Sequence, residues 1–273
     1  MSVELIKGAV LGYPIEHSLS PLLHKTAFDL LGVNGDYSAI EVKSGELEEF
    51  IKTQGAHYNY LSLTMPLKEE ALELKIPMQI DQLGQRIQSL NTLINQEGIW
   101  SATSTDGSGF RKALANAGYD HFNRVLILGA GGTARAVAGA LDDIATSVDV
   151  MRRSVRRSPA IAACFTRIDC DFLDWSDQID LSVYDLVVNT TPSGAADLVA
   201  ENISSKLDGV LFDVLYKPWP TLLARRWSDA GGATISGLEL LLYQGIDQLN
   251  FVAPIGGRLI DGDLRSALLK AVI

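Results

Sequence analysis

A run of small residues, GAGGTA, follows the apolar segment VLIL and precedes an alanine-rich stretch. Gly129, Gly131 and Ala134 have the spacing of the G-x-G-x-x-A pattern, in which the backbone approaches a pyrophosphate and the next helix presents free N–H groups to it. An ordinary turn between a strand and a helix is the alternative, but the strand, turn and helix stand in the order that dinucleotide binding requires. The predicted cofactor-binding residues of this turn are Gly129, Ala130, Gly131, Gly132, Thr133 and Ala134.

An arginine cluster, VMRRSVRRS, lies where the next strand is expected to end. NAD sites usually carry an acidic residue at this point, whereas the 2′-phosphate of NADP needs cationic donors. Guanidinium groups pair with phosphate in a fork geometry, so the cluster favours NADP, with Arg152, Arg153 and Ser154 as the predicted contacts. A solvated loop is the alternative, and it accounts for Arg156 and Arg157 only.

The segment GYPIEHSLSPLLH places two hydroxyls just before an expected helix. Ser20 is predicted to cap that helix, and Pro21 suits its first position. Capping alone leaves Ser18 without a role. His17 and His24 have no further ligand cluster near them in the sequence, so we expect structural roles for both and no metal site.

Strand and helix patterns alternate through the first hundred residues, which predicts a mostly parallel sheet. Strands are expected in LIKGAVLGYP, DYSAIEV and YNYLSLTMP, and helices in SPLLHKTAFDLLG and in SGELEEFIKTQ, the latter with a serine cap. The second half repeats this alternation around the glycine turn, and two helical segments form the tail. A chain of 273 residues is near the length at which one core divides, so the prediction is an α/β protein of two domains.

The acidic composition argues against some kinds of binding partner. A net charge of −10 and a pI of about 4.9 disfavour nucleic acid and anionic membranes, so a small molecule is the expected partner. No segment has the length of a membrane span or the pattern of a signal peptide, and we expect a cytoplasmic protein. Cys164 and Cys170 form neither a CxxC pair nor part of a Cys/His cluster, so neither is assigned a role.

Taken together, these motifs resemble the shikimate dehydrogenase family, and the resemblance covers nearly the whole chain. Besides the opening serine motif and the glycine turn, the matching segments are TMPLK, LNTL, STDGSGF, NTTPSG, DVLYKPWPTLL and GLELLLYQG, in the family's order. The resemblance implies NADP-dependent, reversible reduction of 3-dehydroshikimate to shikimate in aromatic amino-acid biosynthesis. It also implies a substrate-binding and catalytic domain of residues 1–107 and 238–273, and a Rossmann-type NADP-binding domain of residues 108–237.

The resemblance further implies a role for individual residues. Lys68 and Asp106 match the polar pair at the reacting hydroxyl, and a carboxylate beside an amine suits proton transfer and stabilisation of alkoxide charge. Without the resemblance, a surface lysine and an N-cap aspartate are the simpler interpretations. The other residues implied are Ser18, Ser20 and Tyr216 at the substrate carboxylate, Thr64, Asn91 and Gln244 at the ring hydroxyls, and Thr190, Thr191, Ser193 and Gly237 along the cofactor.

Four positions depart from the family pattern. Ser62 and Ser104 replace asparagines, Lys25 replaces another asparagine, and Leu240 replaces a methionine. None of them is part of the proposed catalytic pair, so they leave substrate preference open more than reaction type. A quinate or aminoshikimate dehydrogenase of the same fold, with NAD use possible, and a non-catalytic nucleotide-binding or regulatory relative are the alternatives. The sequence is compatible with a monomer or a homodimer.

Overall fold

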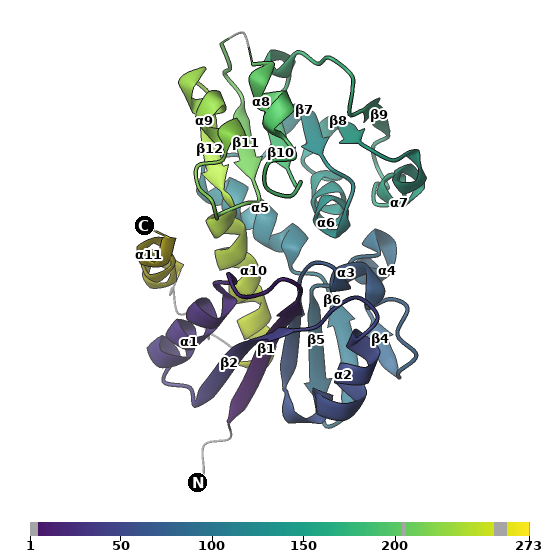
Figure 1. Cartoon of the computed structure of the whole chain (residues 1–273), viewed down its shortest axis with the longest axis vertical. Coiled ribbons are helices and arrows are strands. Elements are labelled where there is room, and N and C mark those ends of the chain that lie inside the picture. The colour runs from purple at the N-terminus through teal and green to yellow at the C-terminus, as the bar shows by residue number, and fades with distance from the viewer. Residues whose placement is uncertain (1–4, 204–205, 254–260, 273) are drawn as a thin grey trace. The chain divides into compact units, whose positions relative to one another are not determined.

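The computed structural model describes residues 5–203, 206–253 and 261–272. The chain divides into two compact units, one of Met1–Gly109 with Leu241–Ala271 and the other of Phe110–Leu240 (Figure 1). Within the described residues, no helix is long and apolar enough to cross a membrane.

The first unit is built on a six-stranded sheet in the order β2-β1-β3-β5-β6-β4. Its strands are β1 Ile6–Gly12, β2 Gly35–Glu41, β3 Tyr60–Leu63, β4 Met78–Ile80, β5 Thr92–Gln96 and β6 Ile99–Thr103. The helices that begin in this unit or return to it are α1 Ser20–Leu31, α2 Leu47–Gln54, the 3-10 turn η1 Gly55–His57, α3 Leu67–Glu70, α4 Gln82–Ile87, α5 Asp106–Asn116, α10 Gly237–Val252 and α11 Asp261–Val272.

This sheet is mixed. The pairs β1–β2, β1–β3 and β4–β6 are parallel as expected, but β5 runs antiparallel to both β3 and β6. Glu97 and Gly98 explain the reversal, since both have positive φ, as a two-residue type I′ hairpin turn requires. The reversal brings the amino end of β5 to the edge of the sheet at which β3 and β6 end.

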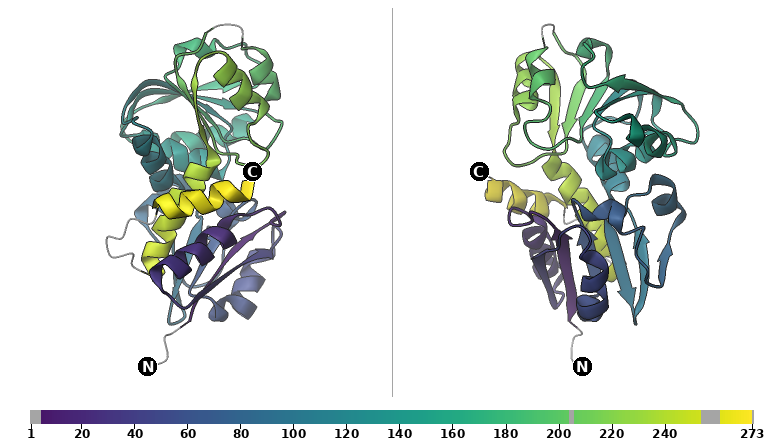
Figure 2. Two further views of the ribbon diagram at one scale, coloured as in Figure 1. Left: turned by 90° about the vertical axis from the view of Figure 1, so that its left-hand side faces the viewer. Right: turned by 45° about the vertical axis from the view of Figure 1, so that its right-hand side comes forward.

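The helices flank this sheet on both faces. The crossover from β1 to β2 moves to one side of β1 within the sheet, and the crossover from β2 to β3 moves back to its other side. Because both crossovers are right-handed, their helices α1 and α2 lie on opposite faces of the sheet, as Figure 2 shows. Buried Leu47 and Ile51 of α2 pack on apolar side chains of the sheet.

Neither serine expected to cap a helix does so. Ser20 is the first residue of α1, Leu19 precedes it without a side-chain cap, and the Ser20 N–H donates to Ser18 Oγ at 3.3 Å. Helix α2 begins at Leu47, and its amino end is satisfied by the Glu70 carboxylate of α3, which accepts the N–H groups of Gly45 and Leu47. A carboxylate from a neighbouring helix therefore does the work expected of Ser44.

The second unit is an all-parallel sheet in the order β12-β11-β10-β7-β8-β9. Its strands are β7 Phe122–Leu128, β8 Ala145–Arg152, β9 Cys170–Asp174, β10 Leu186–Asn189, β11 Val210–Asp213 and β12 Ala233–Ser236. Between them lie α6 Gly132–Leu141, η2 Val155–Arg157, α7 Ser158–Ala162, η3 Leu181–Val183, α8 Asp197–Glu201 and α9 Leu222–Asp229.

Counted from β7, this is the doubly wound order 3-2-1-4-5-6, whose direction reverses between β7 and β10. Strands β7 and β10 are buried along their apolar residues, and Trp227 of α9 packs into the same core. Ligands of such sheets bind outside the carboxyl ends of the strands at the reversal, which here is the position of the glycine turn.

Candidate functional site

In the first unit, the candidate side chains gather at one edge of the sheet. Strands β1, β3 and β6 end at this edge, and the reversed strand β5 begins there. The segments that follow or precede these strand ends carry Ser18, Ser20, Thr64, Lys68, Asn91, Thr105 and Asp106. All of them except Thr105 are site residues that the family resemblance implies. The sequence pattern gives no reason for Asn91 to reach this edge, because it does not predict the reversal of β5.

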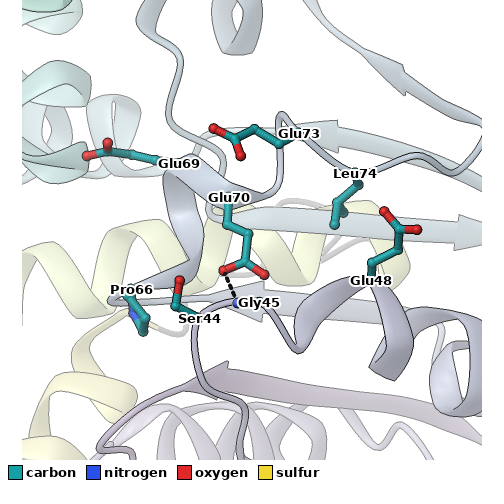
Figure 3. Close-up of a pocket in the computed structure, with 8 residues that line it drawn as sticks. All are labelled: Ser44, Gly45, Glu48, Pro66, Glu69, Glu70, Glu73 and Leu74. Carbon is teal, nitrogen blue, oxygen red and sulfur yellow. Dashed lines mark hydrogen bonds between the residues drawn. The ribbon is translucent and has the colours of Figure 1, made fainter.

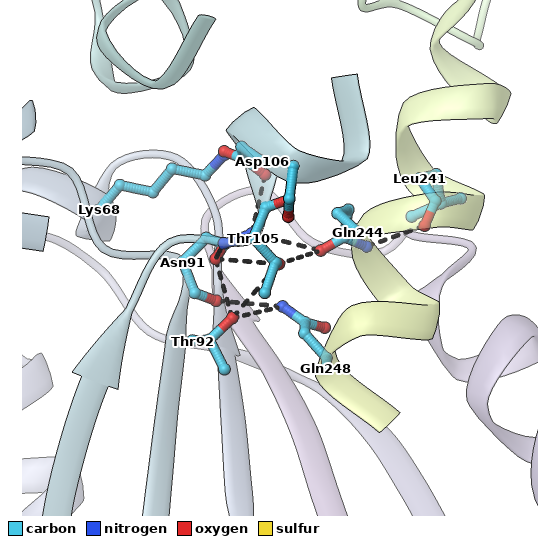
Figure 4. Close-up of polar contacts among 9 residues, drawn as sticks. Lys68, Asn91, Thr92, Thr105, Asp106, Leu241, Gln244 and Gln248 are labelled. Atoms are coloured by element: carbon cyan, nitrogen blue, oxygen red, sulfur yellow. Dashed lines mark hydrogen bonds and ion pairs between the residues drawn. The ribbon is translucent and has the colours of Figure 1, made fainter. Parts of the chain in front are cut away.

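Lys68 and Asp106 form a hydrogen-bonded ion pair. Lys68, on α3, donates from Nζ to Oδ2 of Asp106, the first residue of α5 (Figure 4). The side chains are only 15% and 6% exposed, respectively. Lys68 is therefore not a surface lysine, and a proton can be shared between an amine and a carboxylate that are largely shielded from water.

Asn91 holds the other oxygen of the same carboxylate. Its Nδ2 donates to Asp106 Oδ1 at 2.7 Å, and its Oδ1 accepts the backbone N–H of Thr105 at 2.8 Å. Because a backbone N–H can only donate, this contact fixes which end of the Asn91 amide faces Asp106. Thr105 was not among the expected site residues, although it directly precedes Asp106.

Gln244 reaches this group from α10. Its Nε2 donates to the Leu241 carbonyl at 2.9 Å, and its Oε1 lies 3.3 Å from Asn91 Nδ2 (Figure 4). Gln248, four residues later and so on the same face of α10, bonds to Thr92 Oγ1 at 2.9 Å. The spacing of the two glutamines was the signal that could have identified Gln248 from the sequence.

The remaining candidates of this unit lie on neighbouring loops. Ser20 is buried, Ser18 is half-buried, and their contact at the start of α1 places two hydroxyls beside a helix amino end. Thr64 is half-buried and its N–H is bound to the Leu11 carbonyl, which fixes the backbone at the end of β3.

A recess elsewhere in this unit does not suit an anionic ligand. It lies between α2 and α3 (Figure 3). Its lining is Ser44, Gly45, Glu48, Pro66, Glu69, Glu70, Glu73 and Leu74. The four carboxylates repel a carboxylate or phosphate.

In the second unit, the glycine turn has the form that a pyrophosphate requires. Gly129 has φ +108°, and a Cβ there would lie 2.6 Å from Thr190 Oγ1. Gly131 precedes α6 without a side-chain cap, and a Cβ on it would meet no atom within 4 Å. The turn therefore leaves open space beside the amino end of a ten-residue helix, which fits the phosphates of a dinucleotide.

The loop after β10 lies next to this turn. Thr190 donates to the Leu128 carbonyl at 2.8 Å, and Thr191 donates to Asn189 Oδ1 at 2.7 Å, while Ser193 is exposed. The buried carboxylate of Asp213 accepts from Asn189 Nδ2 at 3.1 Å, and burial raises its pKa.

Two further candidates lie near the ends of β11 and β12. Asp213 accepts the N–H of Leu215, directly before half-buried Tyr216. At Gly237 a Cβ would approach the Val214 carbonyl oxygen to 2.0 Å, so packing within this unit already requires glycine there.

The arginines of the predicted cluster have different surroundings. Arg152 is buried, donates to Ser158 Oγ and the Leu173 carbonyl, and pairs with Asp174. Arg153, like Ser154, is exposed after the end of β8. Arg157, one of the two arginines that the alternative of a solvated loop accounts for, donates to the carbonyl of Ala130 in the glycine turn at 3.2 Å.

The two histidines of the opening motif also differ. His17 is exposed, whereas His24 is fully buried, stacked on Tyr37 at 4.0 Å and bonded through Nδ1 to the Tyr60 hydroxyl. Burial lowers the pKa of His24 to about 3, so the ring is neutral. No group of three or more His, Cys, Asp or Glu side chains in the described ranges is placed to hold a metal ion.

The doubly wound second unit, joined to a first unit with a buried amine–carboxylate pair, defines an α/β protein of the dehydrogenase class. Residues 10–93 match the model of the shikimate dehydrogenase substrate binding domain. The shikimate dehydrogenase (NADP(+)) of Methanococcoides burtonii is 36% identical over 88% of this chain and 89% of its own length. The chain belongs to the shikimate dehydrogenase family.

Solved structures agree with this assignment. The crystal structure of Mycobacterium tuberculosis shikimate dehydrogenase has a TM-score of 0.85 and 31% identity, covering 97% of this chain and 99% of that one. The Thermus thermophilus shikimate 5-dehydrogenase in complex with NADP(H) and shikimate has a TM-score of 0.82 and 30% identity, with coverage of 97% and 99%.

Proposed function

We propose that this protein is an NADP-dependent shikimate dehydrogenase that interconverts 3-dehydroshikimate and shikimate. The observation that carries the proposal is the pair of Lys68 and Asp106, shielded from water and held by Asn91 at the edge of the first sheet. The relatives named for this reaction support it. We also expect a cytoplasmic enzyme, monomeric or homodimeric, that works in aromatic amino-acid biosynthesis.

The proposed chemistry begins with the hydroxyl of shikimate that is to be oxidised. Its proton passes to the pair of Lys68 and Asp106, and the Lys68 ammonium stabilises the developing alkoxide charge. NADP⁺, when bound, accepts the hydride from the same carbon. Which member of the pair holds the proton at each stage is a property of the coupled pair. Reduction of the ketone follows the same steps in reverse.

We assign the substrate carboxylate to Ser18 and Ser20, whose hydroxyls lie beside the amino end of α1. Tyr216 of the second unit is a further candidate for this carboxylate. Thr64, Asn91 and Gln244 are assigned to the ring hydroxyls. Asn91 and Gln244 are buried, and buried polar groups reject analogues without a hydroxyl because they are then left unpaired.

We assign NADP to the glycine turn and to the exposed end of β8. The residues Gly129, Ala130, Gly131, Gly132, Thr133 and Ala134 surround the pyrophosphate in this proposal, and Thr190, Thr191, Ser193 and Gly237 follow the cofactor. The 2′-phosphate is assigned to Arg153, Ser154 and Arg157. The buried Arg152, engaged with Asp174 and Ser158, holds the loop instead of the phosphate.

The experiment is a matrix of initial rates, followed by the absorbance of reduced nicotinamide. Shikimate and quinate are each combined with NADP⁺ and with NAD⁺. The proposal predicts rapid reduction of NADP⁺ by shikimate and slow turnover in the other three combinations. Faster turnover of quinate would assign the protein to the alternative substrate, and cofactor binding without any turnover would favour the non-catalytic alternative.

A further inference from the structure

A chain of hydrogen bonds runs through the first unit to the carboxylate of Asp106. The direction of these hydrogen bonds can be worked out from Asn91. Its Oδ1 accepts the Thr105 N–H and therefore faces away from Asp106. Thr92 Oγ1 lies 2.8 Å from the same Asn91 Oδ1. Because an amide oxygen only accepts, the Thr92 hydroxyl must donate to it.

The next links are fixed in turn. The Thr92 hydroxyl has one proton and donates it in the hydrogen bond to Asn91, so it accepts from Gln248 Nε2 at 2.9 Å (Figure 4). The Gln248 Oε1 then faces Ser62 Oγ at 2.7 Å and accepts its proton, and Ser62 accepts from the Tyr37 hydroxyl at 2.6 Å. Every bond from Tyr37 to Asp106 has the same direction.

Water cannot replace these links. Gln248 is 1% exposed and Thr92 is fully buried, and Tyr37 and Ser62 are buried as well. A second contact, from Gln248 Nε2 to the Asn91 carbonyl at 3.3 Å, ties α10 to the backbone that carries Asn91. A buried chain in which each group has its partner restricts the groups it contains to one arrangement.

We propose that Gln248 is a positioning residue for the reaction, acting through Thr92 and Asn91 on the Asp106 carboxylate. The inference rests on the proposed function. It also gives Ser62 a role that its departure from the family pattern left open, because a single hydroxyl passes one bond from Tyr37 to Gln248. Gln248 touches neither Lys68 nor Asp106 in the described contacts, so its effect is on placement.

The test uses two substitutions that interrupt the hydrogen-bond chain at neighbouring residues. Gln248→Met preserves length and removes both polar ends, and Thr92→Val preserves shape and removes the hydroxyl. Each substitution removes more than one buried hydrogen bond, but its effect reaches Asp106 only through the contact with Asn91. The equivalent of one neutral hydrogen bond lowers kcat by about tenfold at most, so each variant is expected to lose roughly that factor while KM for shikimate changes less than about threefold.

Thr103→Val is the matched control. Thr103, on β6, is paired with Thr92 in the sheet. Its hydroxyl donates to Asp81 Oδ2 at 2.5 Å and takes no part in the hydrogen-bond chain. This variant is expected to keep the kcat of the wild-type enzyme. A loss of activity caused by any disturbance of the sheet would affect both threonine variants alike.

The double variant of Gln248→Met and Thr92→Val distinguishes two possibilities: the two residues act through one hydrogen-bond chain, or they affect kcat independently. Interruption of a single chain predicts about a tenfold loss of kcat in the double variant, and independent effects predict about a hundredfold loss. If Gln248→Met does not fold, Thr92→Val and its control carry the test.

The outcomes are distinct. An active wild-type enzyme with reduced kcat and nearly unchanged KM in both single variants, and with no further loss in the double variant, supports the inference. An active wild-type enzyme whose variants retain kcat, change only KM or lose activity independently overturns it and leaves the proposed function intact. A wild-type protein without turnover of shikimate overturns the proposed function and this role together.

Discussion

The Asn91 amide nitrogen lies 2.7 Å from Asp106 Oδ1, while Lys68 donates to the other oxygen of the same carboxylate. The three side chains come from the amino end of an antiparallel strand, from the start of α5 and from α3. A carboxylate held at both oxygens by partners on two other elements has little freedom to rotate, as a group that exchanges a proton with a substrate hydroxyl requires.

The glycine turn gives a prediction that separates folding from cofactor binding. Gly129→Ala is expected to lower the free energy of unfolding by about 1–3 kcal/mol, because φ +108° strains any residue with a Cβ and Thr190 lies in its way. Gly131→Val fits its extended backbone and open surroundings, so its stability is retained.

The two variants differ in kinetics as well. A valine side chain at 131 occupies the space assigned to the pyrophosphate, so KM for NADP⁺ rises by at least about tenfold if even one charged hydrogen bond is lost. Denaturant unfolding and steady-state kinetics of both variants check this. An unchanged KM for NADP⁺ in Gly131→Val would remove the turn from the cofactor site.

The arginines after β8 give a prediction about cofactor choice. Arg153→Gln and Arg157→Gln are each expected to raise KM for NADP⁺ by about 10- to 100-fold, the equivalent of one charge-assisted hydrogen bond, and to leave KM for NAD⁺ unchanged. Arg156→Gln is the control, since this exposed arginine is not assigned to the phosphate. Equal effects on both cofactors would contradict a contact with the 2′-phosphate.

Buried His24 predicts how stability depends on pH. Its pKa is lowered to about 3 by burial, whereas the unfolded chain binds this proton near pH 6.5. Between pH 6.5 and pH 3 the unfolded state therefore binds a proton at His24 that the native state does not bind, so the free energy of unfolding decreases as pH falls. The contribution amounts to about 2 kcal/mol between pH 7.5 and pH 5.

Denaturant unfolding at several pH values measures this loss. His24→Leu is expected to be less stable at pH 7.5 but to lose about 2 kcal/mol less than the wild-type protein on acidification. His57→Gln changes an exposed histidine and is expected to keep the wild-type slope. Parallel pH curves for wild type and His24→Leu would show that His24 is protonated in the native state.

The sequence predicts the second unit more completely than the first. The glycine turn and the apolar strands around it are local patterns, and the doubly wound order follows from them. The reversal of β5 depends on two residues, Glu97 and Gly98, whose positive φ values no hydrophobic pattern reveals. This reversal delivers Asn91 to the site, so local patterns alone do not reveal its position.

Long-range partners limit the other sequence inferences. Glu70 satisfies the amino end of α2 in place of Ser44, and Asp174 engages Arg152, which removes that guanidinium from the exposed end of β8. Gln248 meets Ser62 across 186 positions of the chain. Each of these contacts is a matter of tertiary packing, which the types and spacing of neighbouring residues do not specify.

The most direct test of the proposed catalytic pair is kcat of Lys68→Ala at saturating shikimate and NADP⁺, with the unfolding midpoint measured beside it. We expect kcat to fall by about 10²- to 10⁴-fold, because the hydroxyl proton and the alkoxide charge lose their partner, and KM for shikimate to stay within a few-fold of wild type. A folded Lys68→Ala enzyme with wild-type kcat would contradict it, since Lys68 would then have no part in the chemical step.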